Sequence, residues 1–123
     1  MDVTERPGRR ATILIAREEI VLMEFEMEPD TDGAGPHFHR RHVDSFHVLE
    51  GELEVTVAEE AVKVGPGKLV YAAPEVVHSF RNLSVPTRLI NIHAPGMRFD
   101  EYMKRMDAGD DPDPAEYDSF PVN

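Results

Sequence analysis

The chain has 123 residues, a length suited to a single domain over residues 1–123, and it has no cysteine, which excludes disulfides, thiolate metal sites and cysteine nucleophiles. Its net charge of −11 opposes binding to nucleic acid. No apolar run approaches the length of a membrane span, and the N-terminus does not resemble a signal peptide, so we expect a cytoplasmic protein without membrane contact.

Alternation of apolar and polar residues dominates residues 11–95, and a period of two predicts β-strands. In EEIVLMEFEMEP, Met23, Phe25 and Met27 alternate with glutamates, so we expect them in the core or an interface and not at a metal. Turn-forming residues separate the runs, a pattern typical of an all-β sandwich or barrel. Further strands are expected at residues 11–16, 43–49, 53–57, 61–64, 69–72, 77–82 and 87–93.

Beyond the last predicted strand the pattern changes. Three apolar residues from Phe99 to Met106 are spaced by four and then three residues, which predicts a short helix over about residues 98–107. The acidic stretch that follows contains two prolines, so we expect residues 108–123 to form an extended or mobile tail. Three apolar residues could still dock the tail on a neighbour: Tyr117, Phe120 and Val122.

Four of the six histidines lie in the stretch PHFHRRHVDSFHVLEG. His37 and His39 are two residues apart, so on a strand both rings lie on the same face, which suits two ligands of one metal ion. Four residues separate His39 from Asp44, and six separate Asp44 from Gly51.

A second group of regularly spaced residues lies in the stretch GKLVYAAPEVVHSFRN. Five residues separate Gly67 from Ala73, and one separates Ala73 from Glu75. Two residues then separate Glu75 from His78, and three separate His78 from Asn82.

In this order the two groups resemble the two motifs of the cupin superfamily, and the resemblance to its small single-domain members extends over about residues 11–95. The first family motif ends in His-x-His, a glutamate and a glycine, and the second contains Pro-x-Gly before its histidine and asparagine. The chain departs from both motifs. Asp44 replaces the glutamate, Ala73 and Glu75 replace the proline and glycine, and Thr31 stands where the first motif begins with glycine.

The resemblance implies an all-β jelly-roll barrel, a double-stranded β-helix, whose interior binds one divalent transition metal ion: Fe, Mn, Ni, Cu or Zn. The implied ligands are His37, His39, Asp44 and His78. Aspartate is one methylene shorter than glutamate, so its carboxylate reaches roughly 1.5 Å less far. Three alternatives remain open for Asp44: the backbone lies closer, a water molecule bridges the gap, or three histidines hold the ion alone.

Three side chains are candidates for a catalytic group beside such a metal: His42, His93 and Tyr71. His42 shares the strand face of Asp44 and could line the site or supply a ligand, although a solvent-facing loop histidine is the favoured interpretation. His93 could transfer protons at the site or be a buried core histidine. His47 has the opposite strand parity to Asp44 and is expected to point away from the cavity.

The resemblance implies a metal-binding protein, expected to be an enzyme that acts on a small oxygenated organic molecule in the manner of a quercetinase-like dioxygenase or an isomerase. The alternative is a non-catalytic metal- or small-molecule-binding sensor module. A titratable group beside the open metal position favours the enzyme, whereas a bare apolar cavity favours the binding module. Because cupins often pair sheets or exchange N-terminal strands, we expect a homodimer with the strand at residues 11–16 as a candidate exchanged edge.

Overall fold

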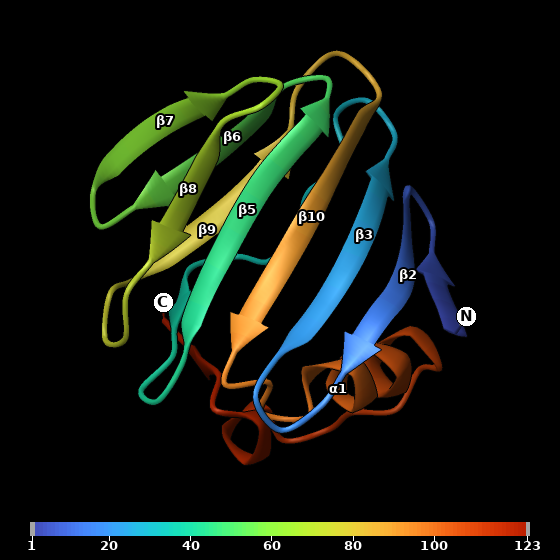
Figure 1. Ribbon diagram of the computed structural model, residues 1–123, viewed down its shortest axis with the longest axis vertical. Coiled ribbons are helices and arrows are strands. Elements are labelled where there is room, and N and C mark those ends of the chain that lie inside the picture. Colours follow the sequence, from blue (N-terminus) through green and yellow to red (C-terminus); the bar gives the residue numbers. More distant parts are fainter. Residues whose placement is uncertain (1, 123) are drawn as a thin grey trace.

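The computed structural model describes residues 2–122, which form two antiparallel β-sheets that face each other (Figure 1). The six-stranded sheet has the order β1-β2-β3-β10-β5-β8, and the five-stranded sheet has the order β11-β4-β9-β6-β7. The strands of the first sheet are β1 (Asp2–Arg6), β2 (Arg9–Ala16), β3 (Val21–Met27), β5 (Val43–Glu50), β8 (Leu69–Ala72) and β10 (Thr87–Ala94). Those of the second are β4 (His37–Phe38), β6 (Leu53–Val57), β7 (Glu60–Val64), β9 (His78–Asn82) and β11 (Phe120–Pro121).

The chain passes back and forth between the two sheets. From β3 to β6 successive strands alternate between them, and β8, β9 and β10 alternate again. This connectivity is the predicted double-stranded β-helix. The sequence did not predict β1, because only Thr4 of its five residues is buried and the strand therefore lacks apolar alternation.

The core follows the period of two that the sequence predicted. On β3, Met23, Phe25 and Met27 are buried, and the glutamates between them lie on the outer face. On β10, Leu89 is buried at the apolar end of the barrel, while the next inward residues are polar. Each fully buried apolar side chain stabilises the fold by about 1.5–3 kcal/mol, so the apolar end carries most of this stabilisation and the other end can hold polar groups.

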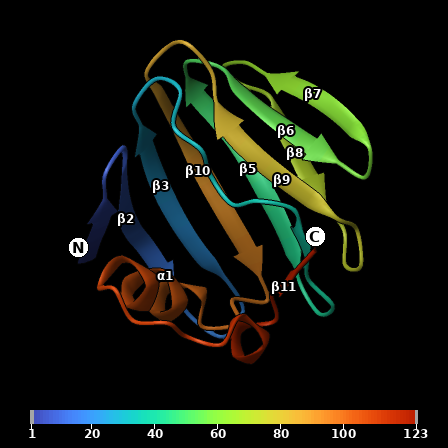
Figure 2. The same cartoon turned by 180° about the vertical axis from the view of Figure 1, so that it is seen from behind.

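The helix α1 (Phe99–Asp107) confirms the predicted helix over residues 98–107 and packs against β1 and β3 at one end of the barrel (Figures 1 and 2). Phe99 and Met103 are its buried residues. Its last residue, Asp107, accepts two hydrogen bonds from the buried guanidinium of Arg9 on β2, each at 2.8 Å. Within residues 2–122 no helix is long and apolar enough to cross a membrane.

The expectation of an extended or mobile tail is wrong. Residues 114–117 form a 3-10 helix, and β11 then pairs with β4 beside the same end of the barrel (Figure 2). Tyr117 is fully buried, Phe120 stacks on Phe38 at 5.3 Å between ring centroids, and Asp118 is buried as well. The tail thus docks on its own chain, because its aromatic side chains and Asp118 find partners there.

The strand at residues 11–16, expected to be an edge that could be exchanged between subunits, is part of β2 and lies inside the sheet. β2 lies between β1 and β3 and pairs with both along most of its length. It therefore has no free edge, and the edges of the six-stranded sheet are β1 and β8.

Candidate metal centre

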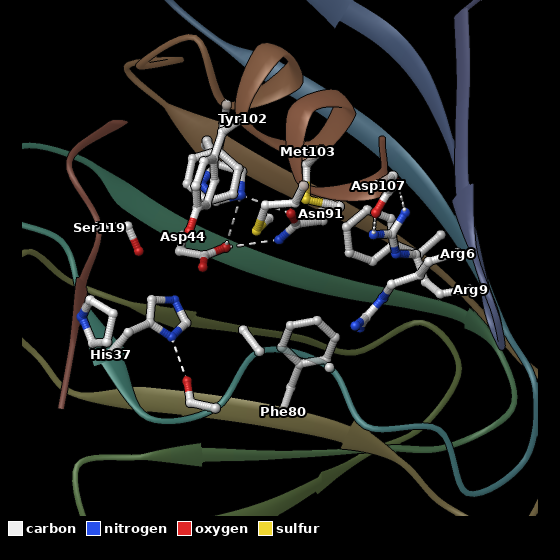
Figure 3. A pocket seen from close by; sticks show the side chains of 18 of the residues that line it. Arg6, Arg9, His37, Asp44, Phe80, Asn91, Tyr102, Met103, Asp107 and Ser119 are labelled. Carbon is white, nitrogen blue, oxygen red and sulfur yellow. Dashed lines mark hydrogen bonds and ion pairs between the residues drawn. The ribbon is translucent and has the colours of Figure 1, made fainter. Parts of the chain in front are cut away.

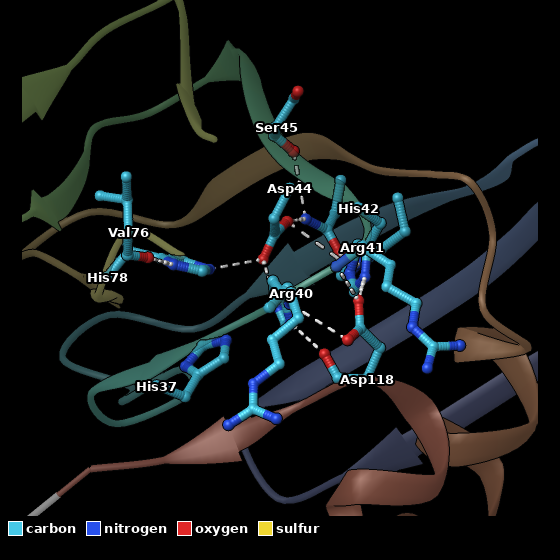
Figure 4. Close-up of polar contacts among 12 residues, drawn as sticks. His37, Arg40, Arg41, His42, Asp44, Ser45, Val76, His78 and Asp118 are labelled. Carbon is cyan, nitrogen blue, oxygen red and sulfur yellow. Dashed lines mark hydrogen bonds and ion pairs between the residues drawn. The ribbon is translucent and has the colours of Figure 1, made fainter. Parts of the chain in front are cut away.

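Four predicted ligands come together inside the barrel at the end covered by α1 and the tail. His37 on β4 lies directly opposite His78 on β9, and Asp44 extends inward from β5 (Figure 4). His39 follows β4, and all four side chains are buried. One nitrogen or oxygen atom from each residue lies within 4.8 Å of the others, a separation compatible with one shared metal ion.

The shorter side chain of Asp44 still reaches the histidines. Its Oδ2 atom lies 2.9 Å from His78 Nε2 and 3.3 Å from His39 Nε2. Its Oδ1 atom accepts a hydrogen bond from Asn91 Nδ2 at 2.8 Å. Of the three alternatives for Asp44, this geometry favours a backbone that lies close enough for direct participation.

The outer nitrogen of each histidine ligand is held by a backbone carbonyl. The Nδ1 atoms of His37, His39 and His78 lie 2.7, 2.8 and 2.9 Å from these oxygens. Since a carbonyl only accepts, each Nδ1 carries the hydrogen, and Nε2 of the neutral ring has a free lone pair. Such contacts fix the ring orientation and tautomer that a metal needs. The three acceptors belong to Gly35, Asp118 and Val76, respectively.

The donor set fits a divalent cation. With Nδ1 protonated, the Nε2 lone pairs of His39 and His78 face the Asp44 carboxylate, and acceptors this close need a shared proton or metal ion. Burial would raise the pKa of Asp44, but His93, His39 and His78 hold it well below its usual value, so the carboxylate is ionised. Burial lowers the pKa of His37 to about 4, which keeps that ring neutral. Burial also opposes charge on His78, yet Asp44 raises its pKa, so a bound cation has to displace a proton more readily held here than on His37.

A second histidine group lies behind the first. His42 is buried, so the favoured interpretation of a solvent-facing loop residue is wrong; its ring packs against His39 and His93 inside the barrel. Nitrogen atoms of the three rings lie within 4.8 Å of one another. However, the rings of His39 and His42 stack with centroids 4.0 Å apart and an angle of 30°. In-plane lone pairs of stacked rings do not converge on one point, so this group fits a hydrogen-bonded chain better than a second metal site.

A series of hydrogen bonds runs from Asn91 through His93 and His42 to Asp118, and its donor and acceptor roles follow from Asn91. Its amide nitrogen donates to Asp44 Oδ1 and to a backbone carbonyl, so its oxygen accepts from His93 Nε2 at 2.8 Å. His93 Nδ1 then accepts from His42 Nε2 at 2.9 Å. The other nitrogen of His42 faces the carboxylate of Asp118 at 2.8 Å. His42 thus has an acceptor on both sides, whereas burial lowers its pKa and opposes a second proton on the ring.

Asp118 of the tail was missed by sequence reasoning, although it makes several contacts with the ligand loop (Figure 4). Its carboxylate accepts hydrogen bonds from the backbone nitrogens of Arg40 and Arg41 at 3.1 and 2.8 Å. Its own carbonyl oxygen is the acceptor for His39 Nδ1. Burial would raise the pKa of Asp118, but its bonds to His42 and the two backbone amides lower it. Nothing in a tail with five acids singles out this one; only the neighbouring aromatic residues indicate docking.

The other residues predicted from the sequence lie either on the outer face of the sheet or beside the candidate ligands. Tyr71 is 58% exposed and pairs with Ser45 on the outer face of the sheet, so its prediction as a catalytic candidate is wrong. His47 is half-buried on that same outer face, pointing away from the cavity as expected. His93 is buried beside the four candidate ligands, and its ring stacks on Phe99 of α1 at 3.7 Å.

A cavity of about 370 Å³ lies beside two of the candidate ligands, under α1 (Figure 3). His37, Asp44 and His93 line one side of it. Its wall is mostly apolar and includes side chains from the barrel and from the helix. These apolar residues are Phe25, Met27, Phe80, Phe99, Tyr102, Met103 and Met106.

The cupin domain family matches residues 23–93, which include all four candidate ligands and make up more than half of the chain. This chain belongs to the cupin family. The cupin is 27% identical over 93 residues to the quercetin 2,3-dioxygenase of Bacillus subtilis, covering 76% of this chain but only 26% of that enzyme. It thus spans about a quarter of the length of the curated relative that it matches.

Two solved structures show the same fold. The structure of KdgF from Halomonas sp. has a TM-score of 0.70 at 23% identity, over 77% of this chain and 86% of that one. A sugar phosphate isomerase of the cupin superfamily from Silicibacter pomeroyi has a TM-score of 0.63 at 18% identity, over 71% and 59% of the two chains. At these identities the likeness extends to the fold and carries no activity to this cupin.

Proposed function

We propose that this cupin binds one divalent transition metal ion through His37, His39, Asp44 and His78 and is an enzyme acting on a small oxygenated organic molecule. The observation that carries the proposal is the arrangement of the three rings. Each is held at Nδ1 by a backbone carbonyl, and the free nitrogens of two of them face an ionised carboxylate beside a cavity. When bound, such a metal supplies a Lewis acid that polarises a substrate oxygen.

The residues around the metal site support catalysis. His93 lines the cavity, and its Nε2–H is held by Asn91, which also fixes Asp44. The hydrogen bonds continue from His93 to the buried His42–Asp118 pair. The apolar wall limits access of water to the reacting atoms. The dioxygenase and isomerase relatives motivate the two reaction classes to be tested.

A non-catalytic metal- or small-molecule-binding module is the second candidate. One observation favours it: burial lowers the pKa of His93 to about 3, which makes the ring a weak base at neutral pH. In this version the cavity binds a ligand on the metal, and the His93–His42 chain serves to hold Asn91 and Asp44 in place.

Metal identification followed by activity screens separates the two candidates. The protein purified without chelators is analysed for transition metals and then loaded separately with Fe(II), Mn(II), Ni(II), Cu(II) and Zn(II). Oxygen uptake and carbonyl isomerisation are measured with panels of small phenols and hydroxy acids. Turnover that is lost in His37→Ala supports the enzyme. Stoichiometric metal and ligand binding without turnover across the panels supports the binding module.

We also propose that the protein is a homodimer. β8 is an edge strand of the six-stranded sheet, and its Leu69 and Tyr71 are 53% and 58% exposed, which supports a contact through this edge. Light scattering coupled to size-exclusion chromatography is expected to give the mass of two chains. A monomer at micromolar concentration would contradict this proposal.

A further inference from the structure

The cavity has a positively charged end opposite its metal-binding end. Arg6 and Arg9 line the end near β1 and β2, whereas His37 and Asp44 lie at the other, with Phe80 between them (Figure 3). Two arginines in a cavity of a chain with a net charge of −11 form a local exception to the overall charge. Their hydrogen bonds decide which of them is available to a ligand.

Arg9 is fully engaged by the protein. Its guanidinium is buried and makes a bidentate pair with Asp107, with both nitrogen–oxygen distances at 2.8 Å. Thr4 donates a further hydrogen bond to the same carboxylate. Arg9 and Asp107 therefore neutralise each other, and their role is to hold α1 on the barrel.

Arg6 is free to bind an anion. Its guanidinium donates one hydrogen bond, to the backbone oxygen of Asp32 at 2.9 Å. Among residues 2–122 no carboxylate oxygen lies within 4 Å of its nitrogen atoms. Partial burial and the nearby Arg9 lower the pKa of Arg6, and the more distant charges of Asp107 and Asp32 oppose this shift. A guanidinium with unused donors in a partly enclosed cavity matches the planar fork of a carboxylate.

We propose that Arg6 binds the carboxylate of the substrate, which is a small organic acid whose oxygen atoms at its other end bind the metal. This inference rests on the proposed metal site and adds the substrate class. A single free guanidinium balances the one charge of a carboxylate. Phe25, Phe80 and Met103 line the cavity, and their apolar surface suits a carbon skeleton, such as a ring, between the two polar ends.

Matched probes test the anion site separately from the metal site. The probes are 3,4-dihydroxybenzoate, which has a chelating diol and a carboxylate, and its uncharged methyl ester. Zinc is the loaded metal because it has no redox chemistry. Calorimetry on the zinc-loaded protein is expected to show the acid binding about ten-fold more tightly than the ester, the difference made by one charge-assisted pair.

Substitutions at Arg6 are expected to remove this preference. Arg6→Gln should bind acid and ester equally, with ester affinity unchanged, and Arg6→Lys should recover only part of the preference because lysine lacks the fork. Arg10→Gln is the matched control, since Arg10 follows Arg9 on the same strand, is exposed and does not line this cavity. An equal loss of acid binding in Arg10→Gln would overturn the proposal, because it would assign the effect to net charge.

The remaining outcomes are also decisive. If acid and ester bind the wild type equally and Arg6→Gln changes neither, the anion site is wrong while the metal site stands. If zinc binds but neither probe does, the cavity does not accept a chelating acid of this size and the inference is overturned. If zinc itself does not bind, the proposed function fails, and the failure is visible before any probe is added.

Discussion

The carboxylate of Asp118 bonds to His42 Nδ1 at 2.8 Å, although the two residues are 76 positions apart in the chain. Through its backbone oxygen Asp118 also holds the ring of His39. The C-terminal tail therefore helps to orient one candidate ligand, His39, and the hydrogen-bonded histidines behind it, His42 and His93.

Replacing Asp118 is expected to weaken metal binding without removing a ligand. Asp118 has a left-handed backbone with φ of 57°, which asparagine tolerates well, so Asp118→Asn removes the charge with little backbone strain. Loss of contacts that orient ligands typically costs 10–100-fold in affinity, and we expect about ten-fold here because the carbonyl contact remains. Competition with a chromophoric chelator measures the change.

Asp111→Asn provides the control for this variant, because Asp111 is an exposed acid of the same tail. Its metal affinity should equal that of the wild type. If both variants bind metal as the wild type does, the tail has no part in the site.

The ion pair between Arg9 and Asp107 is expected to be a major contributor to stability. Both side chains are 4% exposed, so Asp107→Ala leaves a buried, unpaired guanidinium. Breaking a buried pair in this way costs about 3–5 kcal/mol of unfolding free energy. Urea unfolding measures it, with Glu19→Ala as the comparison because the Arg17–Glu19 pair is exposed and contributes less than about 1 kcal/mol. Equal small losses in the two variants would contradict this role.

The stability of the metal-free protein should fall as the pH falls below neutrality. Burial lowers the pKa of His37 to about 4 and that of His93 to about 3, so both rings stay neutral in the fold while the unfolded chain takes up protons below about pH 6.5. Their stabilisation is complete above that pH and is lost as the pH falls towards the folded values. The raised pKa of His78 works in the opposite direction and offsets part of the loss.

Urea unfolding in the presence of a chelator tests this dependence. We expect the unfolding free energy to fall by about 2 kcal/mol or more between pH 7 and pH 5, since each pKa unit corresponds to 1.36 kcal/mol for each group. Equal stability at the two pH values would mean that these rings take up protons in the folded state.

The residues that the sequence predicted correctly are those governed by local spacing. Strand parity was enough to place His47 outside, and the two motifs singled out residues that the fold brings together. Parity also explains the error at Tyr71. Its neighbour Ala72 lies opposite the inward Asp44, so Tyr71 must point outward, and the register of β8 was needed to see this.

The residues that were missed depend on contacts between distant segments. The burial of His42 follows from Asp118 and His93, which approach it from the tail and from β10. A turn can likewise form without its usual residue. Glu75 stands where the family motif has glycine and adopts φ of 74°, and its backbone nitrogen donates to the carbonyl of His39 at 2.6 Å. Neither a pattern nor a composition encodes these pairings.

The metal content of three purified variants tests the central claim most directly. Each variant is loaded with one equivalent of zinc, dialysed without chelator and analysed by mass spectrometry for bound metal. His78→Ala should retain almost none, and Asp44→Ala should retain clearly less than the wild type, because each loses an atom of the proposed ligand set. His47→Ala should retain a full equivalent, since that ring lies on the outer face of the sheet. A full equivalent in His78→Ala, or a wild type that binds no metal, would contradict the account.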